Sequence, residues 1–375
     1  MRIGVDTREL MGRPTGVGRY LSELLGEWAR PASGVAGRHQ FLLYGPSELP
    51  AAMASKVAAL QPVVRVVPGR AGTAWEQLAL RSAAAGDGLD VFLAPAYTAP
   101  LRLSCPVVLT IHDMSYFAHP EWFTWREGAR RRLLTRLAAR RAAVVLTVSS
   151  FSRSEILSHL GLPAAKVRAI HHGAGAPACL AGDAPPSRTA SGALDRQPLV
   201  LYVGSVFNRR HVPDLISAFR LVLAAVPHAR LEIIGENRTY PHQDLEALCR
   251  AAGEGDRIRL RSYVPEVELA DAFRRASAFA FLSEYEGFGL PPLEALASGI
   301  PPVLLDTPVA REVCGPAARY VPAGDVRAIA DALVDLLRNP DARAAVLREA
   351  DSVLSRYSWP EAARLTLAAL ESARR

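Results

Sequence analysis

The stretch AFAFLSEYEGFGLPPLEALASGIPPVLLD, residues 278–306, indicates the class of fold. Its first seven residues begin with five apolar ones and are typical of a strand, and residues 302–306 are typical of a second strand. Between them, a Gly-Phe-Gly turn permits a tight bend, two prolines suit the first positions of a helix, and Gly299 is placed to end that helix. Strand, helix and strand in this order predict parallel strands joined by a crossover helix.

The same alternation of short apolar runs with helical patterns continues along the chain in both directions. It predicts strands at residues 2–5, 41–45, 63–67, 90–95, 106–113, 143–149, 167–172, 199–205, 230–236, 257–264, 278–284 and 302–306. Residues 174–198 lose this periodicity and are rich in Pro, Gly, Ala and Ser, which is typical of a linker.

A chain of 375 residues is too long for one ordinary core. We therefore predict an α/β protein with two Rossmann-like, doubly wound parallel-sheet domains at residues 1–173 and 199–355, joined by the linker. Residues 356–375 are predicted to form an amphipathic C-terminal helix.

The composition excludes several classes of protein. No apolar run reaches the roughly 18 residues that span a bilayer. The N-terminus lacks the basic and apolar segments of a signal peptide, so we expect a cytoplasmic protein. The four cysteines have the spacing of neither a zinc site nor a disulfide framework.

Residues 126–141 are strongly basic, with seven arginines against the single acid Glu127. An apolar stripe at helical spacing accompanies them, formed by Leu133, Leu134, Leu137 and Ala138. Two interpretations stay open. In the first, the segment is a basic amphipathic helix that rests on an anionic membrane surface, at the inner face of the membrane, or binds an acidic partner. In the second, it is a solvated helix of an arginine-rich protein. Nucleic-acid binding is not predicted, because no aromatic-rich basic groove or known binding motif accompanies the charge.

Two glutamates of the opening stretch are candidate binding residues, because open α/β sheets bind ligands at the carboxyl ends of their strands. Glu286 directly follows the strand at 278–284, and Glu294 lies about one turn into the next helix. Carboxylates accept hydrogen bonds from hydroxyl groups, and the N–H groups at a helix N-terminus bind anions. A nucleoside diphosphate sugar, which carries hydroxyl groups on both sides of a diphosphate, fits this layout. The alternative is a helix-capping acid and a solvent-facing glutamate.

A pair of cations follows another predicted strand. In YVGSVFNRRHVPDLISAF, residues 202–219, Gly204 ends a strand, and Arg209 and Arg210 precede a helix predicted to start around Pro213. Two guanidinium groups there could bind a diphosphate and stabilise it as a leaving group. The alternative is a pair of exposed surface arginines.

Three further stretches give weaker signals. Gly16 and Gly18 are predicted in a loop between a strand and a helix, although the third glycine of a dinucleotide fingerprint is missing. His112 follows a predicted strand and could bind a reacting hydroxyl group, or it could be satisfied by neighbouring backbone. Tyr263 and Val264 could contact a base, although a plain turn between a strand and a helix would look the same.

These motifs, in this order, resemble the retaining GT-B glycosyltransferases that carry the E-x7-E motif, which is glycosyltransferase family 4, and among them the bacterial mannosyltransferases. The resemblance extends over nearly the whole chain. It rests on the strings TGVGRY (15–20), WEQLAL (75–80), APAYTAPLR (94–102), IHDMSYFAHPEWF (111–123), VSSFSRSEI (148–156), YVGSVFNRRHVPDLISAF (202–219), SYVPEVEL (262–269) and SEYEGFGLPPLEALASGIPPV (283–303).

The resemblance implies two domains that face a central cleft, with the donor site mainly in the C-terminal domain and the acceptor site mainly in the N-terminal one. It also implies that the C-terminal helix crosses back onto the N-terminal domain. The implied catalytic residues are Glu286, His112, Arg209 and Arg210. The implied donor-binding residues are Gly16, Gly18, Gly204, Tyr263, Val264, Gly287, Phe288, Gly289, Leu290 and Glu294.

The implied reaction moves a hexose from a nucleoside diphosphate sugar to a hydroxyl acceptor, with retention at the anomeric carbon. Guanosine diphosphate mannose is the preferred donor, because the N-terminal strings most resemble bacterial polysaccharide mannosyltransferases, and such enzymes often extend lipid-linked glycans. No cofactor is expected besides the donor, and no metal is required, because no Asp-x-Asp pair follows a strand. 

Two alternatives stay open: a GT-B sugar phosphorylase or epimerase, and a non-catalytic nucleotide-sugar-binding subunit of a membrane complex. The chain also departs from the family at one place, where Arg-Lys-Asn is usual and this sequence has Arg209-Arg210-His211. Arginine is a planar fork and lysine a point charge, so the geometry of a phosphate contact differs between them.

Overall fold

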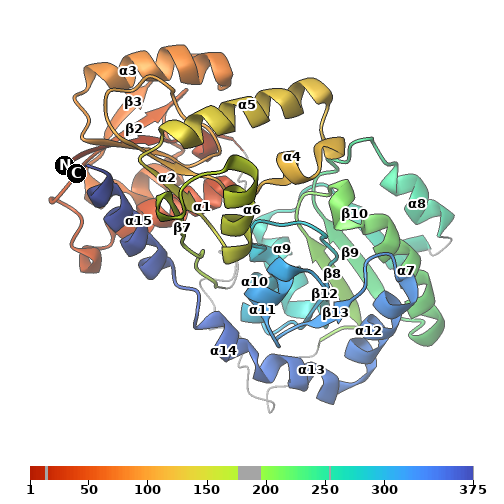
Figure 1. Cartoon of the computed structure of the whole chain (residues 1–375). Helices are drawn as coiled ribbons and strands as arrows, with labels where there is room; N and C mark the ends of the chain where they lie inside the picture. Colours follow the sequence, from red (N-terminus) through yellow and green to blue (C-terminus); the bar gives the residue numbers. More distant parts are fainter. Residues whose placement is uncertain (13–15, 176–195, 253–254, 375) are drawn as a thin grey trace. The chain divides into compact units, whose positions relative to one another are not determined.

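A computed structural model describes residues 1–12, 16–175, 196–252 and 255–374. The chain divides into two compact units (Figure 1): the first unit is Met1–Gly173 with Tyr357–Arg375, and the second unit is Ala174–Arg356. Most of the predicted linker, residues 176–195, and Cys179 within it lie outside the described residues. In the described part of the chain, no helix combines the length and apolar character needed to cross a membrane.

The first unit contains a parallel sheet of seven strands in the order β3-β2-β1-β4-β5-β6-β7. The strands are β1 Arg2–Asp6, β2 Gln40–Gly45, β3 Val63–Val66, β4 Val91–Ala94, β5 Val107–Thr110, β6 Val144–Thr147 and β7 Val167–Ala169. The order reverses direction between β1 and β4, so the loops that follow these two strands flank a topological switch point.

Helices cover both faces of this sheet. They are α1 Gly16–Ala29, α2 Ala51–Lys56, α3 Arg81–Gly86, α4 Ser115–Ala118, α5 Trp125–Arg141, α6 Ser150–Leu160 and α15 Trp359–Ala373, with the short turns η1 Arg8–Leu10, η2 Pro31–Ser33, η3 Ala58–Leu60, η5 Pro120–Trp122 and η6 Ala164–Lys166 and the π-helix η4 Trp75–Leu80. Along β2, Phe41 and Leu43 belong to one hydrophobic cluster, whereas Leu42 and Tyr44 belong to the other. Alternate residues of a strand point to opposite faces, so fully apolar strands such as these are buried on both sides.

The C-terminal helix α15 completes one of these two layers. It packs beside α1 and against β4, β5 and β6. The indole N–H of Trp28, on α1, donates a hydrogen bond of 2.9 Å to the carbonyl oxygen of Ala363, and Leu367 and Leu370 join the same cluster as Ile3 and Val5. Residues more than 300 positions apart in the sequence therefore share one core.

The second unit contains a parallel sheet of six strands in the order β10-β9-β8-β11-β12-β13. The strands are β8 Leu199–Val203, β9 Arg230–Ile234, β10 Ile258–Arg261, β11 Ala278–Phe281, β12 Pro302–Leu305 and β13 Arg319–Val321. The two doubly wound parallel sheets confirm the predicted fold class. The sequence pattern did not predict β13, because its three residues are too few to show a period.

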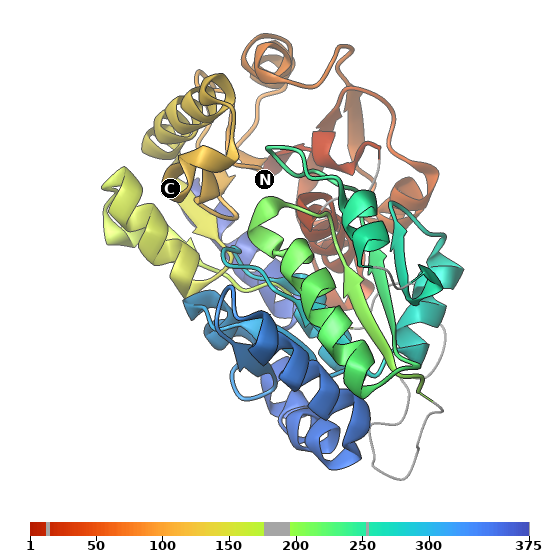
Figure 2. The same cartoon turned by 90° about the vertical axis from the view of Figure 1, so that its right-hand side faces the viewer.

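The helices of the second unit alternate with its strands. They are α7 Val212–Ala225, α8 Leu245–Ala251, α9 Glu266–Arg275, α10 Leu290–Ala297, α11 Pro308–Cys314, α12 Val326–Arg338, α13 Pro340–Arg348 and α14 Ala350–Leu354, with the short turns η8 Asn208–Arg210 and η9 Gly255–Arg257. α7 and α12 lie side by side over one face of the sheet (Figures 1 and 2). The order of the strands reverses between β8 and β11, which places a second topological switch point there.

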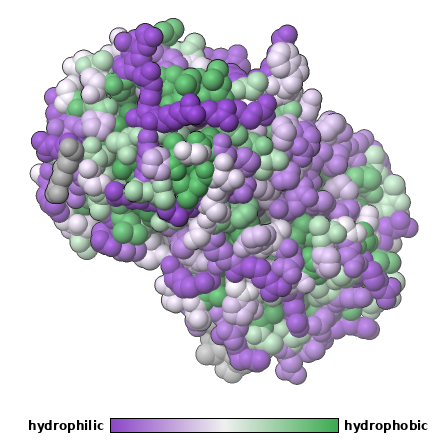
Figure 3. Space-filling view, viewed as in Figure 1, coloured by the Kyte–Doolittle hydropathy of each residue, from purple (hydrophilic) through white to green (hydrophobic). Residues whose placement is uncertain are grey.

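Helix α5 buries mainly small residues. The buried positions are Gly128, Thr135, Ala138 and Ala139, whereas Leu133 is 57% exposed. Of the predicted stripe, Ala138 is buried, Leu134 and Leu137 are half-buried, and Leu133 points outward. In Figure 3 the surface over this helix is mainly hydrophilic.

Candidate active site

The candidate site of the second unit lies at the carboxyl ends of β8 and β11, on either side of the switch point. Gly204 directly follows β8, and its φ of 138° is a conformation that side-chain-bearing residues rarely adopt. A Cβ atom at Gly204 would lie 2.8 Å from Nη1 of Arg210. Glycine at this position therefore lets the guanidinium group approach the backbone.

Arg210 is the central cation of this site. Its Nε atom donates a hydrogen bond of 2.9 Å to Oε1 of Glu286, and its Nη1 atom donates one of 2.7 Å to the carbonyl oxygen of Ser205. The guanidinium carbon lies 4.7 Å from the centre of the Phe281 ring. Burial opposes the charge of Arg210, but the carboxylate of Glu286 outweighs it and raises the pKa of the guanidinium, so Arg210 stays charged.

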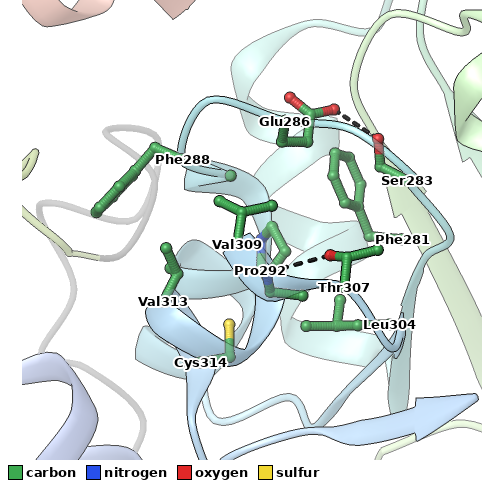
Figure 4. Close-up of a pocket in the computed structure, with 12 residues that line it drawn as sticks. Phe281, Ser283, Glu286, Phe288, Pro292, Leu304, Thr307, Val309, Val313 and Cys314 are labelled. Carbon is green, nitrogen blue, oxygen red and sulfur yellow. Dashed lines mark hydrogen bonds between the residues drawn. The ribbon is translucent and has the colours of Figure 1, made fainter. Parts of the chain in front are cut away.

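Glu286 is held on a second side by Ser283. The hydroxyl of Ser283 donates a hydrogen bond of 2.9 Å to Oε1 of Glu286 (Figure 4). The side chains of Arg210 and Glu286 retain only 11% and 16% of their exposure. The residue expected to bind a diphosphate and the residue expected to contact a sugar are thus bonded to each other in this structure, which the sequence did not reveal.

Arg209 and Arg210 are not the pair of exposed surface arginines of the alternative interpretation. Both guanidinium groups lie over the ring of Phe207, at 4.4 and 5.5 Å from its centre. The carbonyl oxygen of Arg209 accepts a hydrogen bond of 2.9 Å from the N–H of Glu284. This bond joins the turn η8 to the segment that follows β11.

The start of α10 follows the predicted pattern closely. Gly289 precedes the helix with a φ of 95°, and two prolines occupy its first turn, where their missing N–H groups cost nothing. Glu294 lies within α10 and is 7% exposed. The N-terminus of this helix carries positive partial charge and lies just after Glu286, Gly287 and Phe288, so it favours an anion there.

A pocket adjoins Glu286 and extends between α10 and α11 (Figure 4). It encloses about 310 Å³, part of which is open to solvent, and most of its lining is apolar: Phe281, Phe288, Pro292, Leu304, Val309 and Val313. Cys314 lies at its inner end, where burial raises the pKa of the thiol to about 12. Burial of this kind disfavours the thiolate, which is the nucleophilic form of cysteine.

The other predicted residues of the second unit lie beyond the end of β10. Tyr263 is 64% exposed and Val264 is buried. Because β10, β8 and β11 are parallel strands of one sheet, the segments that follow them lie along the same edge. Tyr263 offers a flat, accessible ring at that edge.

His112 belongs to the first unit, where it follows β5. Its Nε2 atom lies 2.7 Å from the carbonyl oxygen of Pro95, which can only accept, so Nε2 carries the proton. The ring packs against Tyr20, Tyr97 and His172, and burial lowers the pKa of His112. His112 is a neutral imidazole at neutral pH and is suited to hydrogen bonding rather than to carrying positive charge.

The sequence analysis predicted that Gly16 and Gly18 lie in a loop, and this prediction is wrong. They are the first and third residues of α1, and Gly18 is buried. The helix begins earlier than expected, and its first residue, Gly16, is exposed with open space where a Cβ atom would lie. Residues 13–15, just before it, lie outside the described residues.

The structure also shows a buried ionic cluster at the switch point of the first sheet that the sequence analysis missed. Asp6 ends β1, and Glu76 lies on η4; both side chains are 1% exposed and both pair with Arg8. Thr98, which follows β4, donates a hydrogen bond of 2.7 Å to Glu76. Glu76 falls within the quoted string WEQLAL, but a single glutamate in an apolar helix gives no period that would mark it.

Two other missed residues lie in the second unit. His211 and Glu284 contact each other at 3.0 Å, between Nε2 and Oε2. Glu284 precedes Glu286 by two residues, in the segment between β11 and α10. That spacing was the available signal. Within the described residues, no group of three or more His, Cys, Asp or Glu side chains is arranged to hold a metal ion.

Comparison with known proteins identifies the family. Residues 14–174 match the model "Glycosyltransferase Family 4", and residues 183–352 match "Glycosyl transferases group 1". The chain is 27% identical to O-antigen chain mannosyltransferase B of Escherichia coli, over 74% of this chain and 73% of that protein. It is 25% identical to the GDP-mannose:cellobiosyl-diphosphopolyprenol alpha-mannosyltransferase of Xanthomonas oryzae pv. oryzae, over 72% and 67% of the two chains.

The fold is also found in solved structures. HepE of Anabaena, in complex with UDP and glucose, superposes with a TM-score of 0.73 at 18% identity and covers 99% of this chain and 100% of its own. The two family matches lie on the two sheet units, and the residues around Glu286 and Arg210 fall within the second match. The chain therefore belongs to glycosyltransferase family 4 and is a GT-B glycosyltransferase that transfers a sugar from a nucleotide sugar.

Proposed function

We propose that this protein is a retaining hexosyltransferase that moves mannose from guanosine diphosphate mannose to a hydroxyl group of a lipid-linked glycan precursor. The observation that carries the proposal is the pair of Arg210 and Glu286 beside the N-terminus of α10. A cation, a carboxylate and a helix N-terminus together match a diphosphate that is joined to a polyhydroxylated sugar. Mannose is preferred because both curated relatives described above are named as mannosyltransferases.

In this proposal the second unit binds the donor. Glu294 accepts hydrogen bonds from the ribose hydroxyls, and Tyr263 and Val264 contact the base. Glu286 and the backbone of residues 287–290 contact the sugar and phosphates. Gly204 has no side chain, so a ligand can approach its backbone closely; a Cβ atom there would lie 2.8 Å from Nη1 of Arg210.

The leaving diphosphate sets the chemical demand on the protein. Its negative charge grows as the bond to the sugar breaks, so fixed cations stabilise the transition state more than the ground state. Arg209 and Arg210 supply this stabilisation, which is on the order of 3 kcal/mol for one well-placed donor. No step in this scheme needs a divalent metal, so we expect transfer activity to persist after treatment with a metal chelator.

The first unit is proposed to bind the acceptor. His112, which is neutral, would accept a hydrogen bond from a hydroxyl group at Nδ1 while Nε2 stays bonded to Pro95. Gly16 and Gly18, in the first turn of α1, would bring backbone close to the donor's diphosphate or sugar.

Helix α5 supports a membrane-bound acceptor. Its outward positions Arg126, Arg130, Arg140 and Arg141 are exposed, as are Trp125 at 75% and Leu133 at 57%. Of its seven arginines, Arg131 forms an ion pair with Glu127. Arginines attract anionic headgroups, and an exposed tryptophan and leucine insert into the interface. We propose that α5 attaches the protein to the cytoplasmic face of an anionic membrane.

The attachment is tested by co-sedimentation with vesicles of phosphatidylglycerol and phosphatidylcholine. Arg126→Glu with Arg130→Glu should abolish binding at low salt, because each arginine contributes about 1 kcal/mol at such a surface. Arg327→Glu with Arg348→Glu, on α12 and α13, changes the net charge equally and should bind like the wild type. Equal binding by both double variants would contradict the attachment through α5.

The donor site is tested first by calorimetric titration of nucleoside diphosphates and their sugars, without added metal, against the wild type and Glu294→Ala. We expect tight binding of one base only and its loss in the variant. Product analysis with a lipid-linked acceptor then separates a transferase from a phosphorylase or epimerase. A well-folded wild type that binds no nucleotide would refute the transferase and favour the non-catalytic subunit.

A further inference from the structure

His211 lies at the junction of the two segments that form the donor site. It directly follows Arg210 and precedes α7, with φ 45° and ψ 38°, the left-handed conformation. Its ring lies between two carboxylates: Nδ1 is 3.1 Å from Oδ2 of Asp214, and Nε2 is 3.0 Å from Oε2 of Glu284. All three side chains are partly exposed, at 25%, 31% and 34%. Protons can therefore exchange with solvent.

The chemistry of these contacts depends on a proton. An ionised carboxylate only accepts hydrogen bonds, so both contacts are hydrogen bonds only when both ring nitrogens carry a proton. A neutral imidazole can donate to Asp214 or to Glu284, but not to both. Both hydrogen bonds are therefore present only in the imidazolium form, which an imidazole adopts at lower pH, and the neutral form keeps one of them.

The contacts of His211 adjoin residues that are proposed to bind the donor. Glu284 lies two residues before Glu286, and the backbone N–H of Glu284 is also bonded to the carbonyl oxygen of Arg209. Arg210, next to His211, is bonded to Glu286. Three contacts thus join residues 209–211 to the segment after β11, and of these only the contact through His211 is made by an imidazole, a side chain that can carry one proton or two.

We propose that His211 is a proton-dependent positioning residue of the donor site, which holds Arg210 and Glu286 in register through Asp214 and Glu284. It does not touch the donor itself. This inference rests on the proposed function of the site. It implies that affinity for a nucleotide sugar is higher when both ring nitrogens of His211 carry a proton, because only then are both carboxylates bonded.

The charged groups that face His211 come from three elements. Asp214 belongs to α7, Glu284 to the segment after β11, and Arg209 and Arg210 to η8. Glu286 completes the set through Arg210. Carboxylic acids in general titrate at lower pH than imidazoles, so a comparison of variants at His211 and at Glu284 separates the two kinds of group.

The informative substitution is His211→Asn. Asparagine is favoured in the left-handed conformation, so the backbone is not strained, and the resemblance to family 4 gives asparagine as the usual residue here. Its amide donates a hydrogen bond but does not titrate. His228→Asn is the matched control, because His228 is an exposed histidine of the same unit.

The experiment is a calorimetric titration of guanosine diphosphate mannose at intervals from about pH 5.5 to 8.5, a range in which the diphosphate diester does not titrate. Wild type and His228→Asn should lose about tenfold in affinity over this range, as expected for one charged hydrogen bond. His211→Asn should show no such slope. Glu284→Gln should flatten the slope as well, because one of the two acceptors is then neutral.

Each outcome decides the inference. A wild-type slope that persists in His211→Asn, or a wild type without a slope, overturns it. A loss in His211→Asn that is equal at every pH and accompanied by a lower melting temperature indicates a structural role only and also overturns it. A wild type that binds no nucleotide sugar at any pH instead refutes the proposed function, and this inference falls with it.

Discussion

The ion pair of Arg210 and Glu286 gives the sharpest prediction for stability and activity together. Arg210→Ala removes hydrogen bonds to Glu286 and to the carbonyl oxygen of Ser205, and it leaves a carboxylate that is only 16% exposed without its cation. Breaking a buried pair costs about 3–5 kcal/mol, and we expect the lower end, about 3 kcal/mol, because both side chains keep some contact with water. Glu286→Ala leaves Arg210 its bond to Ser205 and should cost less.

The double variant Arg210→Ala with Glu286→Ala leaves neither charge behind. Its loss of stability should be smaller than the sum of the two single losses by about 1–3 kcal/mol, which is the coupling energy of the pair. Its transfer rate, in contrast, should be as low as that of either single variant, about 10²–10³-fold below the wild type. Arg210→Ala removes a cation from the leaving diphosphate, Glu286→Ala removes a contact to the sugar, and the double variant lacks both. Stability is thus partly restored by the second substitution, and activity is not.

The assay must report on the second unit. Tryptophan fluorescence reports on the first unit alone, which contains all five tryptophans: Trp28, Trp75, Trp122, Trp125 and Trp359. We would follow urea unfolding by circular dichroism and by hydrogen exchange of the amides in β8 and β11. Additive losses in the double variant would refute the coupling. A single Arg210→Ala variant that keeps wild-type stability and donor affinity would refute the assigned role of the pair.

Two further predictions follow from the same structure. Gly204→Ala should destabilise the second unit by about 1–3 kcal/mol and weaken diphosphate binding, because φ is 138° and the new Cβ would meet Nη1 of Arg210. Gly86→Ala is the control, because a Cβ atom at Gly86 would have open space. Equal melting temperatures for the two variants would contradict this reasoning. Burial lowers the pKa of both His112 and His172 below their unfolded value of about 6.5. The unfolded state therefore binds more protons as the pH falls, so the first unit should lose stability progressively below about pH 6.5. Thermal unfolding followed by tryptophan fluorescence measures this, and a His172→Gln variant with the full wild-type slope would argue against it.

The order of strands and helices was accessible from the sequence because parallel sheets buried on both faces leave continuous apolar runs. Every predicted strand corresponds to a strand of the structure, and the errors lie at the ends. The run predicted at 106–113 is a strand only over Val107–Thr110, because His112 and Asp113 leave the sheet to bond elsewhere. Loop geometry after a strand depends on tertiary partners, and local pattern does not record them.

The donor site was accessible in part. Residue types and their place after strands marked Glu286, Arg209 and Arg210, since carboxylates, guanidinium groups and helix N-termini have fixed chemistry wherever they occur. Their binding roles stay predictions. The direct bond between Arg210 and Glu286 was not predicted, because 76 residues separate them and only the pairing of β8 with β11 brings them together.

Local chemistry is written in short stretches of sequence: the apolar runs that become strands, the glycines and prolines that start and end helices, and the charged groups suited to a nucleotide sugar. Long-range contacts determined the rest. They set the packing of α15 onto the first sheet, the outward turn of Leu133 on α5, and the position of His211 between Asp214 and Glu284. These features arise because protein interiors are close-packed, so the face that a helix buries depends on the shapes of all its neighbours in the unit.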